Sequence, residues 1–225
     1  MDWLAAVDQY CERTGPEYWA EPVNALTNAA FVLAAVVVWP RVRGLPLGQA
    51  MAMVLAVIGV GSWLFHTHAN RLTGVLDVTP IAVFILLYVF AAARDFLGLR
   101  PMLAGLVTAG FVPYALVLTP AFGALPFFGI SAMYWPVPVL ILIFAALLAR
   151  SAPATSRGLV LGAVILIVSL VFRSLDQGVC SALPYGTHFL WHLLNAIMLG
   201  WMIEVWRRHV AFAAVGRQIA GRRTP

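Results

Sequence analysis

Seven runs of mainly apolar residues, separated by short polar segments, set the strongest limit on how this chain can fold. They cover residues 23–40, 49–66, 77–93, 101–119, 132–149, 158–173 and 186–206. A helix of roughly 20 apolar residues spans the hydrocarbon core of a bilayer. Only helices and closed barrels satisfy their backbone hydrogen bonds there. The sequence therefore predicts an all-α membrane protein, a bundle of seven transmembrane helices.

Composition excludes the main alternatives to an integral membrane protein. Of the 225 residues, 62% are hydrophobic and only 10% are charged, whereas soluble domains carry roughly 25% charged residues. The chain thus has almost no material for a separate soluble domain. Its net charge of +5 comes from arginines, because it contains no lysine. Basic residues in a membrane protein report topology, so the charge does not indicate nucleic-acid binding.

The arginines are distributed unevenly between the two sides of the predicted bundle. Eleven follow the first, third, fifth or seventh apolar run, and only Arg13, Arg71 and Arg173 fall on the other side. Because arginine-rich loops stay in the cytoplasm, we expect the N-terminus outside and the C-terminus in the cytoplasm. The chain then divides into an extracytoplasmic segment (1–22), a seven-helix transmembrane domain (23–206) and a basic cytoplasmic tail (207–225).

Polar and ionisable residues gather at the outer ends of three predicted helices. Ser62 and His66 are four residues apart and share a face near the end of the second span, and Asp77 opens the third. His188 and His192, again four apart, lie at the start of the seventh span. Two histidines at this spacing can bind one metal ion, and a third leaves a coordination position open for water, as in catalytic zinc sites. Convergence at one membrane depth favours a metal or proton-handling site.

Other interpretations of these polar residues remain open at this point. A single intramembrane histidine often only hydrogen-bonds to a neighbouring helix, and His66 with Asp77 could form the proton relay of a transporter. His68 points to a different face from His66, and we interpret it as a loop residue. His209 falls on the cytoplasmic side. For Asp176, beside Arg173, we predict an ion pair at a helix end or in the outer loop.

The segment before the first apolar run holds a further polar group, made of Asp8, Tyr10, Glu12, Thr14, Glu17 and Glu21. It fits either a solvated acidic surface or a calcium site, because calcium takes six to eight oxygen ligands. The predicted topology also places Cys11 and Cys180 on the same, oxidising side. A disulfide is permitted there, and two free thiols are the alternative.

Four sequence stretches together resemble the alkaline ceramidase family, a part of a wider group of seven-span membrane hydrolases that includes adiponectin-receptor-like proteins. They are YCERTGPEYWAEPVNALTN, GSWLFH, LDVTP and HFLWH, in this order along the whole chain. Each stretch alone is a weak signal, but the four in the right order and on the right spans are fairly specific. One departure is Val78, which stands where the family has a glutamate after the aspartate.

The resemblance implies roles for the polar residues at the outer ends of the helices. His66, His188 and His192 match the three zinc ligands of the family, and Ser62 and Asp77 match its conserved serine and aspartate. Cys11 and Cys180 match its disulfide. Asp77 would then be the general acid and base, and Ser62 would stabilise the oxyanion or orient the water.

The resemblance also implies a calcium site in the N-terminal segment. Two family glutamates match directly, a tryptophan becomes Tyr10 and would offer its carbonyl oxygen, and an asparagine becomes Thr14. The family's acidic position falls on Gln9, one residue after an aspartate. The expected calcium ligands are therefore Asp8, Tyr10, Glu12, Thr14 and Glu21.

The expected activity is zinc-dependent hydrolysis of ceramide to a sphingoid base and a fatty acid. A hydrolase of another lipid amide or ester, or a seven-span receptor with a structural zinc, would use the same ligands. The implied partners are the bilayer and a ceramide-like lipid, and nothing indicates an obligate protein partner. The expected location is the inner membrane of a bacterium, or the endoplasmic reticulum or Golgi of a eukaryote.

Overall fold

The computed structural model describes residues 2–221, with side chains as far as residue 214. These residues form a bundle of α-helices in the order α1 (Pro22–Thr27), α2 (Ala29–Val38), α3 (Pro46–His68), α4 (Arg71–Ala91), α5 (Pro101–Gly123), α6 (Pro136–Leu148), α7 (Pro153–Leu175) and α8 (His188–Gly221). Shorter helical segments are η1 (Trp39–Val42), η2 (Ala92–Phe96), η3 (Gly129–Tyr134) and η4 (Gln177–Val179).

Six helical segments are long and apolar enough to cross a membrane, and they are Pro22–Val42, Pro46–His68, Arg71–Phe96, Pro101–Gly123, Pro153–Leu175 and His188–Ala214. The remaining predicted span corresponds to the shorter α6, which reaches only about 20 Å at 1.5 Å per residue. The preceding η3 adds a second helical stretch to this pass. The prediction of an all-helical, multi-pass membrane bundle is therefore confirmed, with six long helical segments and one short one.

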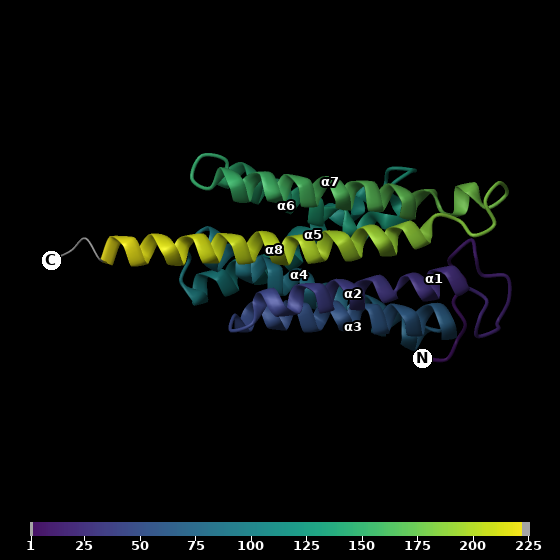
Figure 1. The fold of residues 1–225 in the computed structure, drawn as a ribbon. Coiled ribbons are helices and arrows are strands. Elements are labelled where there is room, and N and C mark those ends of the chain that lie inside the picture. Colours follow the sequence, from purple (N-terminus) through teal and green to yellow (C-terminus); the bar gives the residue numbers. More distant parts are fainter. Residues whose placement is uncertain (1, 222–225) are drawn as a thin grey trace.

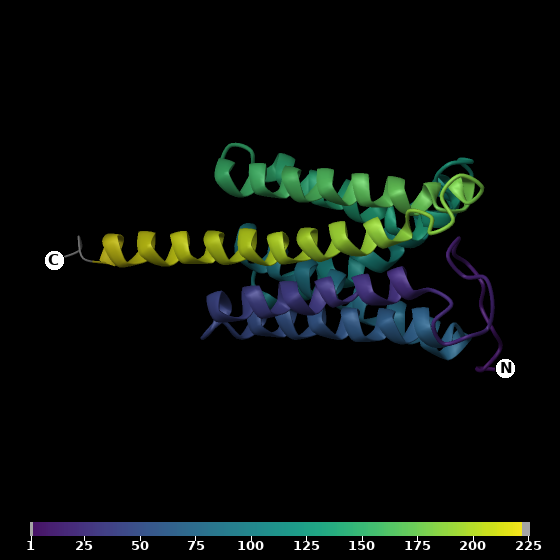
Figure 2. The same ribbon diagram turned by 45° about the vertical axis from the view of Figure 1, so that its right-hand side comes forward.

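The helices run nearly parallel to one another, and α8 occupies the middle of the bundle (Figures 1 and 2). It packs against α7 on one side and α2 on the other, while α3 packs against both α2 and α4. The core along these helices includes Leu55, Leu170 and Ile203, all fully buried. The end of α3 and the start of α8 meet at one end of the bundle, which we call the histidine end.

The helix α4 begins six residues before the predicted span, at Arg71. The Asn70 side chain accepts a hydrogen bond from the Thr73 backbone N–H, and the Thr73 hydroxyl accepts one from Asn70. This reciprocal capping starts a helix. The stretch that it starts is too polar to be included in an apolar run of the sequence. Asp77 therefore lies about two turns inside α4 and does not open it, as we had predicted.

The N-terminal segment lies across the histidine end of the bundle (Figure 1). Val7 donates its backbone N–H to the Ala69 carbonyl at 2.8 Å, and the Arg71 N–H donates to the Ala5 carbonyl at 3.1 Å. These bonds hold the segment against the turn between α3 and α4. A disulfide joins Cys11 to Cys180 in the connection between α7 and α8, as the family resemblance implied.

At the opposite end of the bundle, α8 continues well past the predicted span. It runs to Gly221 as one helix of 34 residues, so most of the predicted tail is helical. Residues 222–225 of that tail lie outside the described residues. His209 is in this part of α8, far from the other histidines of the bundle, and its Nδ1 lies 2.8 Å from the Thr155 hydroxyl.

Candidate metal centre and adjoining cavity

Three histidines from two helices converge at the histidine end. His66 lies in the last turn of α3, and His188 and His192 occupy successive turns at the start of α8. All three side chains are buried. One potential ligand atom from each lies within 4.8 Å of the others. The i,i+4 pair and the third histidine thus come together as the sequence predicted, in a group that could hold a metal ion.

The hydrogen bonding of these histidines fits a metal site. His66 Nε2, His188 Nδ1 and His192 Nε2 are buried and have no hydrogen-bond partner among residues 2–214. His66 Nδ1 lies 2.6 Å from Glu21 Oε2, and His192 Nδ1 lies 2.9 Å from the Thr27 hydroxyl. His66 and His192 are thus held as metal-binding histidines are, with one nitrogen free for the ion and the other fixed by a neighbour. Buried ring nitrogens without a partner are otherwise costly.

Ser62 and Asp77 lie on the wall of a cavity of ≈1210 Å³ at this end of the bundle. His188, Tyr134 and Trp191 line the same cavity. Asp77 as a residue is partly buried, and it lines this space. A carboxyl group, a hydroxyl group and one of the clustered histidines therefore line a single cavity. His68 is the last residue of α3 and not the loop residue that we had predicted. It is exposed and no part of the histidine group.

The predicted ion pair between Arg173 and Asp176 is absent from residues 2–214. Arg173 instead turns into the bundle, where its Nη1 donates to the Ile130 carbonyl and to the Ser131 hydroxyl. Its guanidinium lies over the Tyr134 ring, 5.2 Å from the centroid. Sequence proximity suggested the pair, but successive turns and caps at the end of α7 send the two side chains in different directions.

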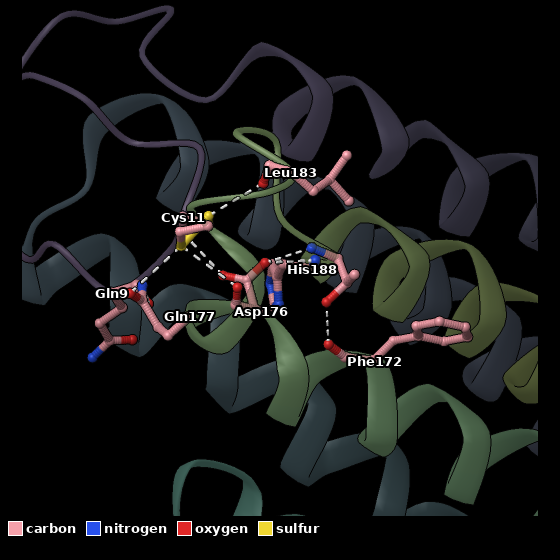
Figure 3. The surroundings of a disulfide bond; sticks show 9 residues. Gln9, Cys11, Phe172, Asp176, Gln177, Leu183 and His188 are labelled. Atoms are coloured by element: carbon pink, nitrogen blue, oxygen red, sulfur yellow. Dashed lines mark hydrogen bonds between the residues drawn. A yellow bond between two sulfur atoms is a disulfide. The ribbon is translucent and has the colours of Figure 1, made fainter.

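Asp176 connects three parts of the histidine end (Figure 3). Its Oδ1 accepts the backbone N–H groups of Thr187 and His188 at 2.7 and 2.9 Å, which caps the start of α8. Its Oδ2 accepts the Cys11 N–H at 2.9 Å. A carboxylate is stabilised at the N-terminus of a helix by the helix dipole. Asp176 therefore fixes His188 relative to the disulfide, a role that its sequence position did not reveal.

Gly186 is required where these parts meet. Its φ is +61°, a left-handed conformation that favours glycine. A Cβ atom at this position would lie 2.7 Å from the Cβ atom of Cys11 and would also overlap the Asp176 carboxylate. The close approach of the disulfide to the start of α8 therefore depends on the absence of a side chain at residue 186.

The predicted calcium ligands do not assemble into a comparable group. Among residues 2–214, the histidine trio is the only set of three or more His, Cys, Asp or Glu side chains with ligand atoms close enough to share an ion. Tyr10 stacks on the His188 ring with a centroid distance of 3.7 Å. Asp8 lies on the cavity wall, and the Thr14 side chain makes no hydrogen bond within the part of the chain that the structure describes. The calcium prediction is not confirmed.

The two remaining predicted calcium ligands already have hydrogen-bond donors. Glu12 accepts the backbone N–H groups of Val23 and Asn24 at the start of α1, at 2.7 and 2.8 Å. Burial raises the pKa of the Glu12 carboxyl, against the opposing effect of these two bonds. Burial also acts on Glu21, but hydrogen bonds from His66 and Arg13 outweigh it and hold the pKa of that carboxyl below its usual range.

Sequence reasoning missed three residues that support the site, namely Arg13, Thr27 and Asp176. Arg13 was counted only as a topology marker, although its guanidinium forms a buried ion pair with Glu21. Thr27 lies in an apolar run, and its contact with His192 becomes visible only when α1 packs on α8. The charged character of Arg13 in an otherwise acidic segment was the one signal available in the sequence.

The fold and the site together define a multi-pass membrane protein with a buried histidine group suited to a metal ion. The sequence model of the Ceramidase family matches residues 6–218. The chain therefore belongs to the Ceramidase family, as its motifs had indicated. Membership implies an amidase, a hydrolase that acts on a ceramide-like lipid. A comparison with curated protein sequences gave no match.

Proposed function

We propose that this protein is a zinc-dependent amidase that hydrolyses ceramide to a sphingoid base and a free fatty acid. The observation that carries the proposal is the set of three buried, unpartnered histidine nitrogens beside a cavity that also holds Asp77 and Ser62. His66, His188 and His192 would hold the ion, which leaves a coordination position for water, as in other catalytic zinc sites. Histidine ligands and a tetrahedral preference favour zinc over calcium or magnesium.

A bound zinc ion would polarise the amide carbonyl and lower the pKa of water to about 7. Asp77, on the cavity wall, accepts the proton of the attacking water and returns it to the departing nitrogen. Ser62 lies one turn before His66 and donates a hydrogen bond to the carbonyl oxygen as negative charge develops on it. The carbon–nitrogen bond breaks, water supplies the new oxygen of the fatty acid, and the proton returned by Asp77 lets the nitrogen leave as a neutral amine.

The cavity suits a lipid with a polar centre and apolar chains. Polar groups such as Asp77 and Arg173 share its wall with apolar side chains such as Ile81, Met133 and Trp191. A substrate could place its amide near the histidines and its chains among the apolar residues. The arginine distribution supports placement of the histidine end on the extracytoplasmic side, facing the periplasm in a bacterium or the lumen of the endoplasmic reticulum or Golgi in a eukaryote.

The proposal is tested by measuring zinc content and turnover on the same detergent-purified samples. We expect one zinc ion per chain by elemental analysis, and release of fatty acid from a labelled ceramide. His192→Ala should lose both. His68→Ala is the matched control, because it removes an exposed histidine close in sequence to His66, and it should retain both.

Each other outcome has a defined meaning. Zinc bound at the histidines without ceramide turnover would leave the metal site intact but would reject ceramide as the substrate. It would favour the hydrolysis of another lipid amide or ester, or a receptor with a structural zinc. A wild-type protein without zinc, even after zinc supplementation, would overturn the metal centre itself.

A further inference from the structure

Two of the carboxylates assigned to calcium by resemblance, Glu12 and Glu21, accept N–H donors on both of their oxygens. We call Glu12, Glu21 and the Arg13 side chain between them the carboxylate cluster. Both Glu12 oxygens accept backbone N–H groups at the start of α1. Glu21 Oε1 accepts from Arg13 Nε, and Glu21 Oε2 meets His66 Nδ1 at 2.6 Å and Asn24 Nδ2 at 3.2 Å. A calcium ion needs six to eight oxygens with lone pairs directed at it, so these residues do not fit calcium.

Arg13 uses all three nitrogens of its guanidinium inside this cluster. In addition to the bond from Nε to Glu21, Nη1 donates to the Gly15 carbonyl and Nη2 donates to the His66 carbonyl, each at 3.0 Å. The Arg13 and Glu21 side chains are 5% and 2% exposed. A rigid fork of donors suits such a buried arrangement of one carboxylate and two carbonyl groups better than a lysine would.

We propose that the Arg13 guanidinium takes the place of a calcium ion in the carboxylate cluster. The N-terminal segment is then held against the bundle without bound calcium. The guanidinium neutralises Glu21 and gathers main-chain carbonyl oxygens, which is what a bound divalent cation would do. A calcium ion and Arg13 could not both bind Glu21, because two cations on one buried carboxylate would lie close together and repel each other strongly.

Arg13 acts on the metal centre through two contacts and is therefore a positioning residue. It holds the Glu21 carboxylate in the orientation that meets His66 Nδ1, and it binds the main-chain carbonyl of His66 itself. Partners of this kind fix the ring of a metal-binding histidine, and their loss lowers metal affinity by about 10- to 100-fold. This part of the proposal rests on the zinc centre proposed above, whereas the exclusion of calcium does not.

The first experiment measures calcium dependence without using zinc or substrate. The full-length protein in detergent is exchanged into calcium-free buffer without a chelator, because a chelator would also remove zinc. Thermal unfolding is then followed with and without about 1 mM calcium, the weak end of protein calcium sites, and bound calcium is counted by elemental analysis. We expect no bound calcium and no shift in the unfolding midpoint.

The second experiment tests Arg13 directly, with Arg13→Gln, Arg13→Lys and Arg157→Gln. The control Arg157 is an exposed arginine near the start of α7, at the opposite end of the bundle. Arg13→Gln should lower the unfolding midpoint and weaken zinc binding by about 10- to 100-fold. Arg13→Lys should recover part of the unfolding midpoint and part of the zinc affinity, because it restores the positive charge but not the forked N–H donors of the guanidinium. Arg157→Gln should match the wild type.

Two results would overturn the proposal. Stoichiometric calcium in the wild type, with a raised unfolding midpoint, would show that calcium and not Arg13 is the resident cation. Wild-type stability and zinc affinity in Arg13→Gln would show that Arg13 does not position the site. Should Arg13→Gln fail to fold, Arg13→Lys and the wild-type calcium measurement still decide the matter. Failure of zinc binding in the wild type would overturn the proposed function and the positioning role of Arg13, whereas the calcium result would stand by itself.

Discussion

The histidine group and the carboxylate cluster lie next to each other, and the sequence nominated metal ligands in both, more strongly in the histidine group. In the structure they differ in which atoms have partners. Each histidine keeps one buried nitrogen without a partner, whereas the four carboxylate oxygens of Glu12 and Glu21 all meet N–H groups. Residue types alone nominate a metal site, but unsatisfied lone pairs that face a common point distinguish a site that needs an ion from one that is complete.

The largest expected effect is a difference in hydrolysis rate between variants of the two aspartates on the cavity wall, Asp77 and Asp8. Asp77→Asn removes the group that we propose to move the proton, so hydrolysis should fall by roughly 100- to 10,000-fold while zinc content stays at the wild-type level. Asp8→Asn, a predicted calcium ligand on the same cavity wall, should have a much smaller effect. Equal losses in the two variants, measured as initial rates on zinc-loaded protein, would contradict a specific role for Asp77.

Stability should depend strongly on the point where the disulfide approaches the start of α8. Gly186→Ala places a methyl group against Cys11 and Asp176 in a left-handed conformation, which costs of order 1–3 kcal/mol for the backbone alone. We expect a lower unfolding midpoint and a lower folded yield. The matched control is Gly178→Ala, where a Cβ atom would meet nothing within 4 Å. If both variants melt alike, the contact does not limit stability.

The sequence predicted the histidine group well because two strong rules apply to it. Apolar runs locate the helices, and the i,i+4 spacing of His188 and His192 places both rings on one face. The carboxylate cluster follows no such rule. Arg13 donates to the His66 carbonyl and Asp176 accepts from the Cys11 N–H, contacts between segments far apart in the chain. Only the path of the N-terminal segment brings these residues together. The start of α4 was missed because a cap made by Asn70 and Thr73 carries no hydropathy signal.

A moderate effect is expected at Thr27, the partner of His192. Thr27→Val keeps the shape of the side chain but removes the hydroxyl that contacts His192 Nδ1. Zinc affinity should decrease by about 10-fold, the lower part of the range for such partners, and less than in Arg13→Gln. Competition with a zinc-sensitive dye would measure both affinities. An unchanged affinity in Thr27→Val would show that the packing of α1 suffices to orient the ring.

The smallest effect concerns Glu12 and appears as a pH dependence of stability. Because burial raises its pKa in the folded protein, the folded state favours the protonated carboxyl more than the unfolded state does. The contribution of Glu12 to the free energy of unfolding is therefore complete when the pH is below 4.5, the usual pKa of a glutamate. This contribution decreases as the pH rises through the pKa of Glu12 in the folded protein. Glu12→Gln removes the titration, so the variant should lose less stability than the wild type between pH 4.5 and neutrality.

Thermal unfolding of the wild type and Glu12→Gln across this pH range tests the expectation. Glu12→Gln should be somewhat less stable at every pH, because the amide nitrogen cannot accept the second backbone N–H at the start of α1. The difference between the two proteins should narrow as the pH rises. A difference that widens with pH would instead mean that ionised Glu12 stabilises the fold. In that case a cation beyond Arg13 would be needed to balance the carboxylate cluster, and the contrast with the histidine group would be lost.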